Sequence, residues 1–124
     1  FLPKDSCEAM RLYRLAAEQQ HSKAMYALGE MFRLGECTEI NYNEAMHWYR
    51  SAAELELPAA LFAVGLMYQN GYGVDADHQQ GLEWVRRAAS KGHQGAIDYL
   101  RRTGDSWVAE QMHESVVVTL KPSN

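Results

Sequence analysis

The sequence is short of net positive charge and of long apolar runs. Its 12 lysine and arginine residues are outnumbered by 16 aspartate and glutamate residues, which gives a formal net charge of −4 at pH 7. A protein that binds nucleic acid or an anionic membrane needs a concentrated basic face, so we expect neither kind of partner. The longest apolar run, residues 59–68, is broken by Gly65 and is far shorter than the roughly 20 residues that span a bilayer. We therefore expect no insertion into a membrane.

Motifs for metal ions and phosphate groups are also lacking. No two of the five histidines are four residues apart, and the two cysteines form no Cys-x-x-Cys motif, so we expect helix-surface histidines rather than metal ligands. The spacing Gly71-Tyr72-Gly73 is only superficially similar to a phosphate-binding loop, because no lysine follows where one would be needed. The sequence therefore predicts no cofactor and no metal site. The histidines concerned are His21, His47, His78, His93 and His113.

What the sequence does contain is an internal repeat. Residues 22–57 align without gaps to residues 58–93, 36 positions later, with nine identical pairs. Ordinary residue frequencies would give roughly two. A fixed period of this size is typical of a solenoid of stacked supersecondary units. The identical pairs are Ala24/Ala60, Ala27/Ala63, Gly29/Gly65, Met31/Met67, Gly35/Gly71, Trp48/Trp84, Arg50/Arg86, Ala52/Ala88 and Ala53/Ala89.

The repeat extends beyond the two complete copies. Residues 5–21 match the second half of a repeat, and residues 94–102 match the first helix of a third copy. A solenoid that starts on a second helix leaves an apolar stripe with no first helix beside it. We therefore expect the chain to be a fragment of a longer one, and chains extended at the N-terminus to be more stable. Residues 106 to about 115 are expected to form a helix that caps the stack. The sequence thus predicts one domain over residues 1–120 and a tail over residues 121–124.

Within each repeat unit, apolar residues recur at the i, i+3/i+4 and i+7 positions, and this pattern predicts two helices per unit. The first helices are expected to end at Gly35 and Gly71, which can adopt the left-handed conformation of a C-cap. The second helices are expected to begin at capping boxes, in which an Asp or Asn side chain and a Glu or Gln three residues later satisfy free backbone N–H groups. The three boxes are Asp5 with Glu8, Asn41 with Glu44, and Asp77 with Gln80.

Small residues are expected where helices approach each other closely. A glycine in the middle of a helix costs roughly 1 kcal/mol in helix propensity, and we expect Gly29 and Gly65 to offset this by letting paired helices come together. The second helices carry Ala-Ala pairs that are expected to contact the next repeat, where overpacking costs about 1–3 kcal/mol. These residues are Ala52, Ala53, Ala88 and Ala89.

Four elements of the repeat resemble the Sel-1-like repeat, a relative of the tetratricopeptide repeat with a longer loop between its helices. They are Ala-x-x-x-Leu-Gly-x-x-Tyr, Gly-x-Gly-Val, Trp-Tyr and Ala-Ala, and the resemblance covers about residues 5–102. It implies an all-α fold, in which antiparallel helix pairs stack into a right-handed superhelix with the first helices lining a concave face. The sequence departs from the family pattern at Cys37, in place of the second loop glycine, and at Gly81 and Val85, which suggest local repacking.

The two cysteines, Cys7 and Cys37, leave two alternatives open. Their number does not fit the disulfide-dense pattern of a small secreted scaffold. A disulfide needs Cα atoms within roughly 7 Å, and these two positions lie nearly one repeat apart. We therefore favour free thiols over a bridge.

The resemblance also implies which residues face the groove. In tetratricopeptide-like helix pairs the first helix presents its second, fifth, ninth and twelfth positions to the groove, while the seventh, eighth and eleventh pack inward. We set Leu28-Gly29 and Val64-Gly65 as the seventh and eighth positions. The expected partner-binding residues are then Lys23, Tyr26, Glu30, Arg33, Ala59, Phe62, Leu66, Gln69, Asp98 and Arg102.

Tyr26, Phe62 and Leu66 would be apolar side chains that face solvent. Such an arrangement suits an aromatic-anchored peptide or helix better than a small polar metabolite. The alternative is that a neighbouring helix, such as residues 106–115, covers them as ordinary core.

We expect a protein-interaction scaffold or adaptor with no catalysis of its own, monomeric or dimeric through its uncovered first helix. Members of the family that the chain resembles have bacterial regulatory, envelope or host-interaction roles, and some were connected with binding or cleaving β-lactams. The serine-enzyme motifs S-x-x-K, S-D-N and K-T-G do not occur. A ligand-binding or hydrolytic protein that uses the same groove is the alternative.

No basic-then-apolar leader follows Phe1, so a signal peptide is absent or already removed. The sequence leaves the compartment open between the cytoplasm and the bacterial periplasm.

Overall fold

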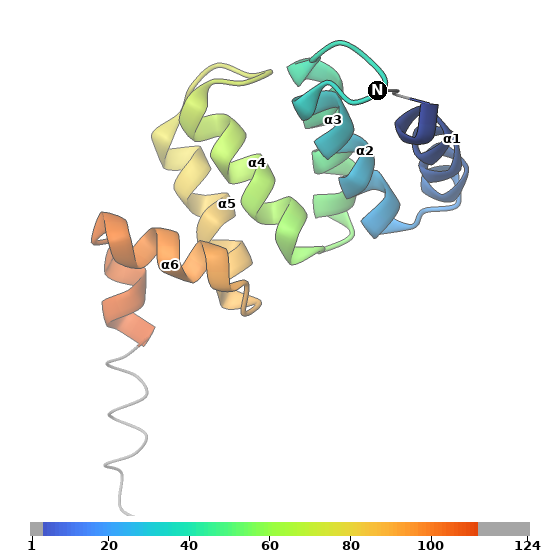
Figure 1. Cartoon of the computed structure of the whole chain (residues 1–124). Helices are drawn as coiled ribbons and strands as arrows, with labels where there is room; N and C mark the ends of the chain where they lie inside the picture. The colour runs from blue at the N-terminus through green and yellow to red at the C-terminus, as the bar shows by residue number, and fades with distance from the viewer. Residues whose placement is uncertain (1–3, 112–124) are drawn as a thin grey trace, which may run out of the picture.

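The computed structural model describes residues 4–111, which form helices and turns without a strand. The helices follow one another across the molecule in chain order, from α1 at one end to α6 near the other (Figure 1). Within residues 4–111, no helix is both long and apolar enough to cross a membrane. The expected all-α solenoid with a 36-residue period is confirmed, since α2 and α4 begin at residues 22 and 58. The helices are α1 (Lys4–Glu18), α2 (Ser22–Leu34), α3 (Tyr42–Glu54), α4 (Pro58–Asn70), α5 (His78–Ser90) and α6 (Gln94–Thr103).

The ends of the helices repeat together with the sequence. α2 and α4 end at Gly35 and Gly71, whose φ angles of 76° and 71° place both in the left-handed region that favours glycine. α3 and α5 begin after Asn41 and Asp77, and each side chain accepts a hydrogen bond of 3.1 Å from the backbone N–H three residues later. The side-chain half of both expected capping boxes is therefore confirmed. The reciprocal half is wrong, because the backbone N–H groups of Asn41 and Asp77 bind the Phe32 and Tyr68 carbonyls.

The capping box expected at the start of the first helix is wrong. α1 already includes Asp5 in its first turn, and the Glu8 carboxylate binds Arg11 at 2.5 Å. In the later repeats the cap residue is held extended because its own backbone N–H donates to the carbonyl of Phe32 or Tyr68 in the preceding first helix.

Close approach of paired helices explains the glycines within α2 and α4. A Cβ atom on Gly29 would lie 2.5 Å from the Tyr49 ring, and one on Gly65 would lie 2.6 Å from a Val85 methyl group. Tyr49 and Val85 are both fully buried, so each second helix packs a large side chain onto a bare stretch of the first. The alanines expected between repeats are buried as well: Ala52, Ala53, Ala88 and Ala89.

The preference for free thiols is wrong, because Cys7 and Cys37 form a disulfide with their Cα atoms 4.8 Å apart. The expectation treated the distance along the sequence as a distance in space. α1 and α2 are joined by a tight turn, so the start of α1 lies beside the loop that follows α2. Cys37 also adopts a φ of 64°, close to the 73° of Gly73 at the equivalent position of the next repeat. The loop therefore keeps its glycine-like conformation although a cysteine replaces the family's glycine.

The chain turns again after α6. Gly104 is left-handed, and the Asp105 carboxylate accepts the Trp107 backbone N–H at 2.9 Å and pairs with Arg86 at 2.7 Å. Residues 106–111 are helical, and Trp107 and Val108 pack half-buried against the core. The rest of the expected capping helix lies outside the described residues. The predicted domain boundaries stay a prediction.

Candidate partner-binding groove

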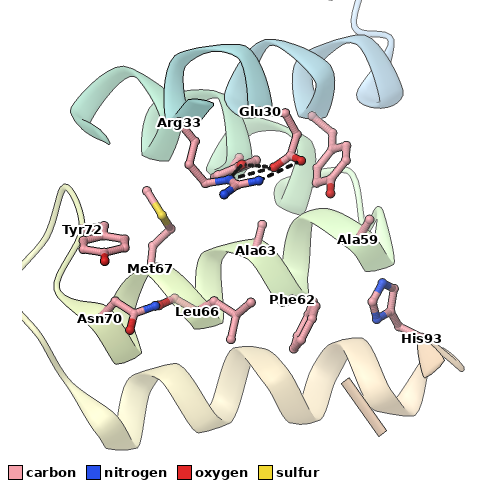
Figure 2. A pocket seen from close by; sticks show the side chains of 12 residues that line it. Glu30, Arg33, Ala59, Phe62, Ala63, Leu66, Met67, Asn70, Tyr72 and His93 are labelled. Carbon is pink, nitrogen blue, oxygen red and sulfur yellow. Dashed lines mark hydrogen bonds and ion pairs between the residues drawn. The ribbon is translucent and has the colours of Figure 1, made fainter. Parts of the chain in front are cut away.

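The first helices α2 and α4 enclose a cavity of about 390 Å³, which we call the central pocket. Residues spaced three or four apart share one face of a helix, and this spacing brings side chains of both first helices to one place. Glu30 and Arg33 point from α2 towards α4, while Ala63 and Met67 point back from α4 (Figure 2). Tyr72 lies at one end of the pocket and His93 at the other. The remaining lining residues are Tyr26, Tyr49, Ala59, Phe62, Leu66 and Asn70.

The polar wall of the central pocket is a three-residue hydrogen-bonded cluster. The Arg33 guanidinium donates to both carboxylate oxygens of Glu30 at 3.1 Å and to the Tyr49 hydroxyl oxygen at 3.1 Å. The Tyr49 hydroxyl in turn donates to Glu30. Tyr49 reaches this wall from α3 through the space left by Gly29, so the core contact of the helix pair also sets the position of the polar groups.

The cluster shifts the pKa of each member. Burial alone would raise the pKa of the Glu30 carboxyl, but the hydrogen bonds from Arg33 and Tyr49 outweigh it and hold the pKa below its ordinary value. Burial, followed by the hydrogen bond to Glu30, raises the pKa of the Tyr49 hydroxyl. The hydrogen bond with Glu30 raises the pKa of Arg33. At neutral pH the pocket wall therefore holds an ion pair and a neutral phenol.

The opposite side of the central pocket is apolar and aromatic. Phe62 lies with its ring centroid 5.0 Å from His93 and 6.1 Å from Tyr99, in tilted and edge-on arrangements. The His93 Nδ1 atom accepts the backbone N–H of Ala96 at 3.1 Å and so caps α6. The expectation of helix-surface histidines is therefore wrong for this residue, which is half-buried at the pocket wall.

Six of the ten expected partner-binding residues line the central pocket: Tyr26, Glu30, Arg33, Ala59, Phe62 and Leu66. The other four lie outside it. Lys23 and Arg102 are exposed, the Gln69 amide donates to the His78 carbonyl at 3.2 Å, and Asp98 accepts a hydrogen bond from Gln94. A partner-binding role remains a prediction for all ten.

The alternative in which the C-terminal helix covers the aromatic residues finds no support in the described part of that helix. None of residues 106–111 lines the central pocket. Tyr26, Phe62 and Leu66 are each only half-buried in the described structure. The central pocket thus presents apolar groups to solvent.

Several lining residues were missed from the sequence. Tyr49 was assigned to the second helix, and its register gave no sign that the hydroxyl group passes between α2 and its neighbour to reach the pocket. Tyr72, in the loop after α4, stacks on Tyr42 at the start of α3 with ring centroids 4.4 Å apart, and no repeat pattern indicates this contact. For His93 a signal existed, because its position just before the third first helix is where an N-cap belongs.

The central pocket combines groups that can form hydrogen bonds with aromatic and aliphatic side chains. Among the described residues no serine, threonine or cysteine lines it, and the Nδ1 atom of His93 accepts the backbone N–H of Ala96. Between residues 4 and 111 there is no group of three or more His, Cys, Asp or Glu side chains that could hold a metal ion. A carboxylate, a guanidinium group, hydroxyl groups and aromatic faces together suit recognition of a polypeptide.

Comparison with solved structures places the fold among helical repeat proteins. A Sel1 repeat protein from Oxalobacter formigenes is 37% identical with a TM-score of 0.64, over 68% of this chain and 36% of that one. A protective antigen of uropathogenic Escherichia coli with an SLR fold is 36% identical with a TM-score of 0.73, over 78% of this chain and 20% of that one. Helicobacter pylori cysteine rich protein B is 20% identical with a TM-score of 0.69, over 73% of this chain and 68% of that one. This likeness shows a shared fold.

The chain thus spans 36% and 20% of the lengths of the first two proteins. A search of the curated proteins gives no match. A family model described as the Sel1 repeat matches residues 1–21, 22–57 and 58–93, in the same register as the internal repeat. Those three matches, on a chain folded as stacked helix pairs, show that it belongs to the Sel1 repeat family.

Proposed function

We propose that the chain is a protein-interaction scaffold whose central pocket binds a peptide or helix of a partner protein, without catalysis of its own. Sel1 repeats generally mediate protein–protein interaction. The observation that carries the proposal is that Tyr26 of one repeat and Phe62 and Leu66 of the next line one cavity and remain half-exposed. A side chain from a partner would bury apolar surface that the folded chain leaves in contact with water.

The size and lining of the central pocket support a side-chain anchor. At about 390 Å³ the cavity lies in the usual range for ligand pockets, roughly 300–1,000 Å³. A few side chains seated in well-packed pockets, with Trp, Tyr and Arg most frequent among them, contribute most of the binding energy at protein interfaces. The Glu30–Arg33 pair at the edge offers hydrogen bonds that fix the direction of a bound chain.

A random peptide library displayed on phage tests the proposal, with the complete chain immobilised as bait. Peptides selected on the wild-type chain are then measured against Leu66→Glu, which puts a charge into the central pocket at a half-exposed position. The matched control is Leu55→Glu, because Leu55 is 45% exposed and lies outside the pocket.

We expect Leu66→Glu to weaken binding at least about tenfold, as expected when an anchor pocket is lost, and Leu55→Glu to leave it unchanged. Circular dichroism confirms that both variants fold. Equal binding by both variants, or a failure of any peptide to bind the wild-type chain, would remove the proposal.

A further inference from the structure

We propose that the partner segment combines an aromatic or large aliphatic anchor with a neighbouring lysine or arginine. The anchor occupies the central pocket, and the basic side chain lies over an acidic hollow beside it. This inference rests on the proposed function and names the chemistry of the partner.

The acidic hollow is a second depression of about 440 Å³ between α1, α2 and the loop after α2. It shares Tyr26 and Glu30 with the central pocket, so the two depressions form one continuous surface. The disulfide between Cys7 and Cys37 joins the helix and the loop that form its walls. A chain bound in the central pocket would reach the hollow by passing Tyr26.

The part of this surface that forms the acidic hollow carries negative charge. Among the side chains that the structure describes, residues 5–111, every charged one that lines the acidic hollow is a carboxylate, namely Asp5, Glu30 and Glu36. Arg33 is the one lysine or arginine that lines the central pocket, and both oxygens of Glu30 already bind it. With three carboxylates and one guanidinium, the combined surface carries a formal charge of −2 with His93 neutral.

Two of these carboxylates are available to a partner. Asp5 and Glu36 are exposed and form no ion pair with the side chains of residues 5–111, whereas Glu30 is already paired. Asp5 and Glu36 therefore offer unpaired negative charge next to an apolar cavity.

Charge complementarity then selects among possible partners. A basic side chain over the acidic hollow gains attraction from Asp5 and Glu36 and keeps the anchor in place. An acidic segment, or the phosphate backbone of a nucleic acid, would meet repulsion along the same path. The apolar cavity alone would accept any anchored peptide, so the hollow is what makes the surface discriminate.

The test compares two charge reversals in one loop. Glu36→Lys changes a residue that lines the acidic hollow, and Glu39→Lys makes the same change of net charge at an exposed residue that does not line it. The probes are library-selected peptides and synthetic versions in which each lysine or arginine is replaced by glutamine. Binding is measured by fluorescence polarisation at low and at high ionic strength.

We expect selected peptides to carry an apolar anchor with a basic residue nearby, and Glu36→Lys to weaken their binding about fivefold at low ionic strength. Glu39→Lys should change it by less than about twofold, and replacing the basic residue by glutamine should abolish the difference between the two variants. If peptides depend on Leu66 but respond equally to both reversals, or if acidic peptides are selected, the charge inference is overturned while the proposed function stands. If binding does not depend on Leu66, the proposed function itself fails.

Discussion

Replacing Gly29 of α2 with alanine adds one methyl group at the closest contact between paired helices. The new Cβ atom would lie 2.5 Å from Cδ1 and 2.6 Å from Cε1 of Tyr49, distances that real Cβ contacts do not reach. The ring cannot simply turn aside, because Tyr49 is fully buried and its hydroxyl group is bound to Glu30 and Arg33. Either the helices separate or the hydrogen bonds at the pocket wall break.

The magnitude follows from two opposing effects. Alanine is favoured over glycine within a helix by about 1 kcal/mol, which would stabilise the variant. Overpacking a filled core costs about 1–3 kcal/mol, and the upper part of that range applies here because the obstructing atoms belong to a fixed ring. We expect a net loss of about 1–2 kcal/mol in the free energy of unfolding.

Urea denaturation followed by circular dichroism measures this difference through the midpoint and the slope. Gly65→Ala is a companion variant with a larger expected loss, since its Cβ atom would also lie 2.9 Å from the backbone oxygen of Gly81. Because propensity and packing predict opposite signs, the result is decisive. A Gly29→Ala chain that is more stable than the parent would refute the close approach of α2 and α3.

Further predictions concern packing, the disulfide and pH. Ala52 is fully buried, so Ala52→Leu should cost about 1–3 kcal/mol, and an unchanged thermal midpoint would contradict the packing between repeats. Reducing the Cys7–Cys37 disulfide, which spans 30 residues, should lower the free energy of unfolding by about 3–4 kcal/mol and speed amide exchange in α1 more than in α4; equal acceleration would show that the bridge does not hold α1. Because the folded-state pKa of Glu30 lies below its ordinary value of 4.5, its stabilising contribution is complete above about pH 5 and is lost as the pH falls through the folded-state pKa. When the free energy of unfolding is measured by denaturation at several pH values, it should therefore fall more for the parent than for Glu30→Gln between about pH 6 and about pH 3. Equal losses in the two chains would show that ionised Glu30 does not stabilise the fold.

Much of the fold could be predicted because each repeat carries its own local signals. Gly35 and Gly71 end their helices as left-handed caps, and Asn41 and Asp77 begin the next helices through their side chains. These are interactions among residues a few positions apart, which a sequence pattern can report directly. The expectation for Asp5 was wrong because α1 begins at Lys4, so Asp5 lies within the first turn rather than before it.

Contacts between distant residues were harder to predict. Cys7 and Cys37 are far apart in the sequence, and only the antiparallel course of α1 and α2 brings their Cα atoms to 4.8 Å. The repeat register assigned Gln69 to the groove, but Gly81 leaves space on the other side, where the Gln69 amide binds the His78 carbonyl instead. A departure from the repeat pattern at one position thus redirected a side chain on the neighbouring helix.

In the candidate site, too, local features could be predicted and contacts between distant residues could not. Tyr26 and Phe62 were expected on one face of the first helices, and both line the central pocket because a helix fixes which residues share a face. The polar cluster could not be predicted, because the hydroxyl of Tyr49 enters the pocket from a different helix through the gap at Gly29. Register gives the direction of a side chain but not how far it reaches.

The most direct test of the account is a map of amide chemical shifts when a library-selected peptide is added to the isotopically labelled chain. If the central pocket is the binding surface, the largest shifts should fall on α2 and α4, at Tyr26, Arg33, Phe62 and Leu66, and at His93 beside them. Shifts concentrated instead on exposed positions of α3 and α5, such as His47 and Glu83, with α2 and α4 unchanged, would contradict it.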